Sequence, residues 1–176
     1  NKALKKHFGF SPKFFRNTEL VYNNSIAAMV EKMGFAGMLA EGWDEILRWR
    51  SPNFLYQAKG GALRLLARNY KLSDDIGFRF SNREWKEWPL TAEKYTEWIN
   101  LLNLDQQCQT VNLFMDYETF GEHQWEETGI FKFFEAFFWK TLENPRNRFV
   151  LPSKLIAEVE PAGELDFWRL VSWADM

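Results

Sequence analysis

The feature that most constrains the fold is an alternation of short apolar runs with segments of helical periodicity along the 176 residues. Strands are expected near residues 18–22, 35–40, 54–58, 62–67, 111–115 and 149–151. Helices are expected at 2–8, 26–33, 43–49, 91–102, 129–142 and 154–159. Gly77 weakens the prediction of a further helix at 71–80. Residues 81–90 are expected to form a loop, and 161–176 an irregular tail. Such alternation predicts an α/β architecture with parallel strands and flanking helices.

Composition narrows the class of protein and its partners. The length suits one compact domain, and a net charge of −2 argues against a nucleic-acid partner, which normally meets a concentrated basic face. The single Cys108 excludes an intramolecular disulfide and fits a reducing compartment. No apolar run reaches membrane-spanning length and no signal-peptide pattern begins the chain. We therefore expect a cytoplasmic protein with no membrane partner and no cofactor.

A group of titratable residues follows the expected strand at 111–115. Asp116 stands at the carboxyl end of this strand, and Glu118, Glu122 and His123 come within the next seven residues. A carboxylate at the carboxyl end of a strand lies at the usual active-site edge of an α/β sheet. The alternative is that Asp116 only caps a turn. The clustering of the other titratable groups favours a chemical role.

A second carboxylate, Glu19, lies in the strand-like run at 18–22, where it needs either a partner such as Arg16 or a function. In a parallel fold Glu19 and Asp116 would face one another from the same edge, and paired carboxylates are what glycoside hydrolysis requires. The abundant aromatic residues fill a core or line a cleft. Side chains that could contact a sugar in such a cleft are Arg16, Tyr22, Trp43, Arg50, Trp85, Glu118, His123 and Trp125.

Several motifs resemble those of one enzyme family. The segments FRNTELVYNN at 15–24 and FMDYETFGEHQW at 114–125 resemble motifs of glycoside hydrolase family 57, the α-amylase and 4-α-glucanotransferase family. RSPNF at 50–54, EWPLTAEKY at 87–95 and SWAD at 172–175 resemble its α-amylase-type members.

The resemblance implies an incomplete seven-stranded (β/α) barrel that cleaves α-1,4-glucans with retention of configuration. Glu19 then matches the nucleophile after the fourth strand, and Asp116 matches the acid/base after the seventh. The family's amino-terminal histidine motif has no match here. The resemblance thus predicts that residues 1–176 are strands four to seven of the catalytic barrel, truncated at both ends, with an α-glucan or maltooligosaccharide as substrate. The carboxyl groups of Glu19 and Asp116 are expected roughly 5 to 7 Å apart.

Two other functions remain open at the level of sequence. Asp116, Glu118, Glu122 and His123 could bind a metal ion in a hydrolase of the carbohydrate-deacetylase kind. Alternatively, the strongly apolar helix at 129–142 could dock a partner in a non-catalytic interaction module.

A half-barrel also leaves the edge of its first strand unpaired, so the chain is expected to self-associate there.

Overall fold

The computed structural model describes residues 2–104 and 108–175. Contacts within the chain divide it into two compact units. We call the first, Asn1–Arg68 with Val150–Met176, the sheet unit and the second, Asn69–Phe149, the helical unit. Each unit has its own hydrophobic core. No helix in the part of the chain that the structure describes is long and apolar enough to cross a membrane.

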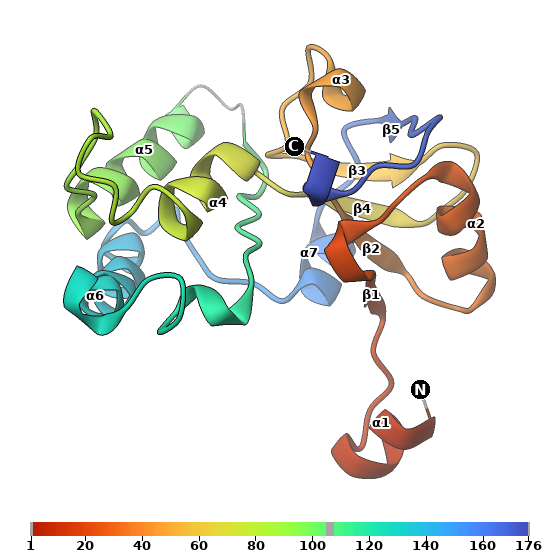
Figure 1. The fold of residues 1–176 in the computed structure, drawn as a ribbon. Helices are drawn as coiled ribbons and strands as arrows, with labels where there is room; N and C mark the ends of the chain where they lie inside the picture. The colour runs from red at the N-terminus through yellow and green to blue at the C-terminus, as the bar shows by residue number, and fades with distance from the viewer. Residues whose placement is uncertain (1, 105–107, 176) are drawn as a thin grey trace. The chain divides into compact units, whose positions relative to one another are not determined.

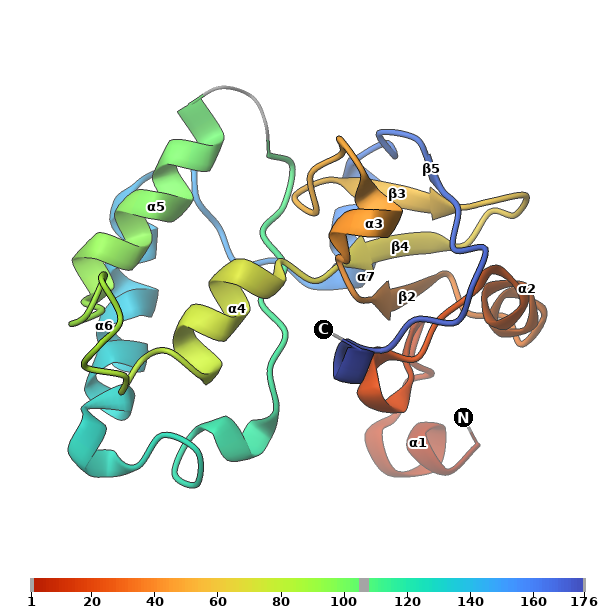
Figure 2. The same cartoon turned by 45° about the horizontal axis from the view of Figure 1, so that its top comes forward.

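The sheet unit is built on one five-stranded sheet with the order β1-β2-β4-β3-β5. Three neighbouring pairs, β1/β2, β2/β4 and β3/β5, are parallel, and only β3/β4 is antiparallel. The strands are β1 Phe14–Arg16, β2 Gly37–Ala40, β3 Leu55–Ala58, β4 Arg64–Ala67 and β5 Glu164–Leu165 (Figures 1 and 2). The mixed α/β fold is therefore confirmed, with β3 as a departure from the expected parallel order.

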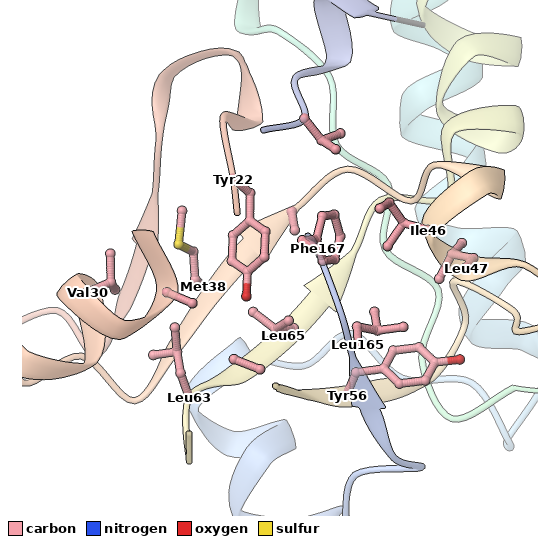
Figure 3. Packing of buried hydrophobic residues seen from close by; sticks show 14 residues of the cluster. Tyr22, Val30, Met38, Ile46, Leu47, Tyr56, Leu63, Leu65, Leu165 and Phe167 are labelled. Atoms are coloured by element: carbon pink, nitrogen blue, oxygen red, sulfur yellow. The ribbon is translucent and has the colours of Figure 1, made fainter. Parts of the chain in front are cut away.

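The helices of the sheet unit are α1 Lys2–Phe8, α2 Asn24–Lys32, α3 Asp44–Leu47 and α7 Pro152–Glu158, as expected from the sequence. The first core lies among the sheet, α2 and α3, whereas α1 has no buried residue. Asn23 caps α2, because its side chain accepts a hydrogen bond from the amide of Ile26 at 2.8 Å. Met38 and Leu65 of the sheet contribute to the same buried cluster as Tyr22 (Figure 3).

The helical unit contains α4 Tyr70–Gly77, α5 Ala92–Leu104 and α6 Ile130–Glu143. Within the segment at 71–80, a helix does form as far as Gly77, which is the last residue of α4. Phe133 and Phe137 of α6 are buried against Tyr95 of α5. Burial of α6 is one-sided, because Trp139 on the same helix is 70% exposed.

The strand expected at 111–115 is absent. The apolar side chains of Val111, Leu113 and Met115 do pack on the helical core, but Asn112 between them is buried as well, so burial here is not one-sided. The backbone, however, bonds to the start of α4: the carbonyl of Asn112 accepts from the Asn69 amide at 2.9 Å. Alternation therefore marked an extended segment packed on helices instead of a strand in a sheet.

Two other expected strands are also absent. In the run at 18–22, residues Thr18–Leu20 form a short 3-10 helix, and the strand is the preceding Phe14–Arg16. At 149–151 no strand forms, and Phe149 and Leu151 are 51% and 72% exposed. Conversely, the tail at 161–176 contains β5, which pairs with β3. Short apolar runs do not reveal which of them will find a neighbouring strand, because pairing is a long-range contact.

Candidate active site

Three charged residues stand at one edge of the sheet. Arg16 is the last residue of β1, and Glu41 and Arg68 directly follow β2 and β4. Because these three strands are neighbours and parallel, their carboxyl ends meet at the same edge. This is the edge at which open α/β folds bind their ligands.

Glu19 follows β1 on a strained turn at this edge. The φ angles of Glu19 and Leu20 are 51° and 50°, in the left-handed region that side chains other than glycine rarely adopt. Asn17 braces the turn: its side chain accepts from the Thr18 amide and donates to the Val21 carbonyl, both at 3.1 Å. Residues held in such conformations cost about 1–3 kcal/mol each and gather at functional sites. The strain at Glu19 is thus consistent with a functional role.

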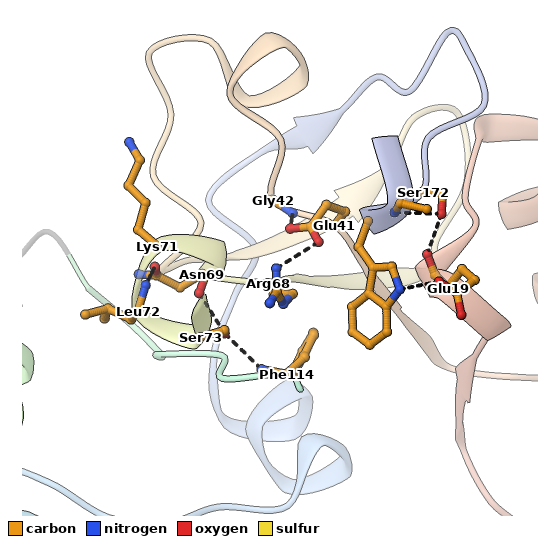
Figure 4. A network of polar contacts seen from close by, with 12 residues as sticks. Glu19, Glu41, Gly42, Arg68, Asn69, Lys71, Leu72, Ser73, Phe114 and Ser172 are labelled. Atoms are coloured by element: carbon orange, nitrogen blue, oxygen red, sulfur yellow. Dashed lines mark hydrogen bonds and ion pairs between the residues drawn. The ribbon is translucent and has the colours of Figure 1, made fainter. Parts of the chain in front are cut away.

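The end of the chain holds both the side chain and the backbone of Glu19 (Figure 4). The indole Nε1 of Trp173 donates a hydrogen bond to Glu19 Oε2 at 2.6 Å, and Ser172 Oγ donates to the Glu19 carbonyl at 2.9 Å. Just before these residues, Val171 and Tyr22 exchange two backbone hydrogen bonds of 2.9 Å each. A segment about 150 positions away in sequence therefore defines where the Glu19 carboxylate lies.

Trp173 in turn contacts two guanidinium groups. Arg16 lies 5.0 Å and Arg68 lies 5.4 Å from the centre of a Trp173 ring. Arg68 Nη1 also donates to Glu41 Oε2 at 3.3 Å, and Glu41 Oε1 accepts from the Gly42 amide at 2.7 Å. The Glu41 and Arg68 side chains are 0% and 6% exposed, so this ion pair is buried.

Asp116 belongs to the helical unit and precedes the 3-10 helix Tyr117–Thr119. Its backbone carbonyl accepts from the Thr119 amide at 3.1 Å, but its side chain makes no capping hydrogen bond. The turn-capping alternative for this carboxylate therefore lacks its defining contact. The distance between the Asp116 and Glu19 carboxyl groups stays a prediction, because the two residues lie in different units.

The residues that follow Asp116 present their side chains at the surface. Glu118, Glu122, His123 and Trp125 are all exposed, and Trp125 is 64% exposed. No group of three or more His, Cys, Asp or Glu side chains within residues 2–104 and 108–175 is arranged to hold a metal ion. The metal-dependent alternative thus has no donor set in the described geometry.

Tyr22 requires a correction among the residues expected to bind sugar. Its ring is fully buried and packs edge-on against Phe167, with ring centres 4.5 Å apart. Burial raises the pKa of the Tyr22 hydroxyl. A ring covered in this way has no free face for stacking on a sugar, so Tyr22 is a core residue.

Trp43 and Arg50 lie in the sheet unit and already contact other side chains. Arg169 places its guanidinium 4.1 Å from the Trp43 ring centre, and Arg50 lies 5.1 Å from the ring of Trp49. Arg50 also borders a cavity of about 290 Å³. The other residues lining this cavity are Ile46, Arg48, Lys59, Glu164, Asp166 and Trp168.

Sequence reasoning missed three residues of the site. Glu41 and Arg68 stand directly after short apolar runs, and that position is the signal that could have identified them. Trp173 lies within the SWAD segment, yet nothing in the sequence indicates that it contacts Glu19. Only the fold brings these residues together.

A mostly parallel sheet with a carboxylate at the carboxyl ends of its strands is typical of (β/α) glycosidases. Comparison with known proteins identifies the family. The family model described as "Glycosyl hydrolase family 57" matches residues 1–167, and the chain belongs to that family. The chain is 47% identical over 176 residues to a protein of Methanocaldococcus jannaschii described as "Putative alpha-amylase". The match covers 99% of this chain and 37% of that relative.

A solved structure supports the fold. The crystal structure of the 4-alpha-glucanotransferase from Thermococcus litoralis matches with a TM-score of 0.74, over 99% of this chain and 27% of that one. The two sequences are 18% identical, so this likeness concerns the fold alone.

Proposed function

We propose that this chain carries the two catalytic carboxylates of a retaining glycoside hydrolase that acts on α-1,4-glucans, with Glu19 as nucleophile and Asp116 as acid/base. The supporting observation is the environment of Glu19. It lies on a strained turn at the carboxyl-end edge of the sheet, and Trp173 holds one oxygen of its carboxylate. Family membership and the name of the Methanocaldococcus jannaschii relative support the reaction class and the α-glucan substrate. Residues 1–176 would then correspond to strands four to seven of the barrel, with an extended segment at 111–115 that forms no strand where the seventh is expected.

The proposed chemistry follows from the two carboxylates. Because Trp173 occupies Oε2 of Glu19, Oε1 is the oxygen placed to attack the anomeric carbon. Asp116 gives its proton to the departing glycosidic oxygen, and a covalent glycosyl-enzyme forms. Asp116 then takes a proton from the incoming water or glucan hydroxyl, which releases the sugar with retained configuration. Hydrolysis and transfer share this intermediate and differ only in the acceptor. The mechanism requires the two carboxyl groups roughly 5 to 7 Å apart.

The proposed contacts with the glucan come from polar and aromatic side chains of both units. Trp125 is exposed and has a ring that a sugar can stack on, and the exposed Glu118 and His123 can bond to hydroxyl groups. In the sheet unit, Trp43 is proposed to stack on a sugar ring, and Arg16 and Arg50 are proposed to bond to hydroxyl groups. Tyr22 is left out because it is buried.

Single substitutions in the full-length protein test the two roles. Glu19→Gln is expected to abolish turnover of both maltooligosaccharides and glycosyl fluorides, because no nucleophile remains. Asp116→Ala is expected to lose activity on maltooligosaccharides but to retain glycosylation by glycosyl fluorides, whose leaving group needs no proton. Stopped-flow fluoride release and reducing-sugar assays measure these rates.

Glu122→Gln is the matched control, since this exposed carboxylate follows Asp116 by six residues and is expected to leave turnover unchanged. Equal loss of Asp116→Ala activity on both substrates would contradict the acid role. Loss of activity in Glu122→Gln, together with sensitivity to a chelator, would favour the metal-dependent alternative. Glucan binding with no turnover in the unaltered protein would favour a non-catalytic module.

A further inference from the structure

We propose that Glu41, Arg68 and Trp173 form a positioning relay that orients the carboxylate of Glu19. The relay runs from the buried Glu41–Arg68 ion pair, through the face of the Trp173 indole, to the hydrogen bond between Trp173 Nε1 and Glu19 Oε2 (Figure 4). The inference rests on the proposed role of Glu19 as nucleophile. It assigns to three residues a task that family membership alone does not give them.

The first step of the argument concerns the buried ion pair. Moving two charges out of water costs about as much as their attraction returns, so a buried pair adds little stability compared with apolar residues of similar size. Stability therefore does not explain why Glu41 and Arg68 are charged. Their location gives a better reason, because both follow adjacent parallel strands at the site edge.

The second step concerns rigidity. The amide of Arg68 donates to the carbonyl of Ala40 at 2.9 Å, and Glu41 Oε1 accepts from the Gly42 amide. A Cβ at Gly42 would lie 2.0 Å from the Arg68 carbonyl oxygen, so only glycine permits this close approach of the two chains. The backbone from which the Arg68 side chain extends is therefore fixed relative to Glu41.

The third step concerns the indole. An indole N–H is a donor only, so it can bond to a carboxylate oxygen but cannot accept from another group in exchange. Guanidinium groups of Arg16 and Arg68 near the ring are attracted to its electron-rich faces, which holds the ring in place and polarises the N–H donor. The bond to Oε2 then selects one rotamer of Glu19 and leaves Oε1 directed toward substrate. Small errors in such positioning reduce rates strongly.

Two variants of the full-length protein test the relay. Trp173→Phe keeps the ring but removes the donor, and kcat is expected to fall about tenfold to a hundredfold, the effect of one hydrogen bond to a charged group. Glu41→Gln with Arg68→Met removes both charges together, so neither is left buried and unpaired. This double variant is expected to fold, as circular dichroism and thermal denaturation would show, yet to have a similarly reduced kcat. KM for maltooligosaccharides is expected to change by less than about twofold in both variants.

Arg68→Lys is a second test of the upstream link, by which we mean the contact between the Glu41–Arg68 pair and the Trp173 indole. Lys keeps a positive charge beside Glu41 but lacks the planar group that lies against the indole, so kcat is again expected to fall. Arg48→Met is the matched control: it removes a guanidinium that lies 5.5 Å from the ring of Trp168 in the same unit. This control is expected to keep the kcat of the unaltered protein.

The outcomes separate the relay from the proposed function. Turnover by Glu19→Gln would overturn the nucleophile assignment itself. If Glu19→Gln is inactive while Trp173→Phe and the folded double variant keep full kcat, the proposed function stands and the relay is wrong. Should the double variant not fold, Arg68→Lys decides: full kcat overturns the upstream link, and reduced kcat at unchanged KM supports it.

Discussion

At the scale of one residue, Tyr22 places a polar hydroxyl group inside the hydrophobic core. Its side chain is 0% exposed, and its hydroxyl has no hydrogen-bond partner among the residues that the structure describes. A buried hydroxyl without a partner costs about 1–3 kcal/mol. We therefore expect Tyr22→Phe to raise the free energy of unfolding by about 1 kcal/mol in urea denaturation. Tyr95→Phe is the matched control and is expected to lower it, because the Tyr95 hydroxyl donates to the Leu72 carbonyl at 2.8 Å.

The same residue predicts a dependence of stability on pH. Burial raises the pKa of Tyr22 in the folded state, whereas the unfolded chain releases this proton near pH 10. Above about pH 10 the folded state holds a proton that the unfolded state has lost, so the contribution of Tyr22 to stability is complete below that pH and decreases above it. Tyr22→Phe should reduce the loss by about 1.4 kcal/mol per pH unit in that range. Identical slopes for the two proteins would contradict this assignment.

At the scale of elements, the extended segment before Asp116 is held by hydrogen bonds to the start of α4, and not by a neighbouring strand. Ser73 of α4 is buried, and its Oγ donates to the Asn69 carbonyl at 2.7 Å and accepts from the Phe114 amide at 3.2 Å. Ser73→Ala would leave these groups without that partner, so we expect a loss of about 1–3 kcal/mol in unfolding free energy. Hydrogen exchange at the Phe114 amide should become faster, and kcat should fall because Asp116 is two residues away.

Ser153→Ala is the matched control for Ser73→Ala. Ser153 is an exposed residue of α7, and its substitution is expected to change stability by less than about 0.5 kcal/mol. Unchanged exchange at Phe114 in Ser73→Ala would show that the segment is held by its apolar contacts alone.

At the scale of the whole molecule, β1 is the element that exposes the chain to self-association. The strand order places β1 at one edge of the sheet, with β2 as its neighbour. An edge strand offers backbone groups for pairing with another chain. We expect the isolated 176-residue chain to self-associate as its concentration rises in sedimentation velocity. A longer chain that supplies a strand beside β1 is expected to show less association through this edge, because the backbone groups of β1 would then be paired. A monomeric chain at every concentration would refute the prediction.

Local patterns were sufficient to predict much of this protein from its sequence. Helices whose apolar residues recur with helical spacing and whose caps are side-chain acceptors, such as α2 behind Asn23, were predicted, because both signals lie within one turn of the chain. The family was predicted from contiguous motifs, and the family model confirms it. Glu19 and Asp116 come from the same motifs, and their catalytic roles stay predictions.

Tertiary structure alone decided which apolar runs pair and what surrounds Glu19. The runs at 35–40 and 111–115 were both predicted to be strands, yet only the first finds neighbouring strands, and the second packs on helices. Trp173 and Arg68 reach Glu19 from positions far along the chain. Such contacts depend on where the chain returns in space, which no local pattern of residues encodes.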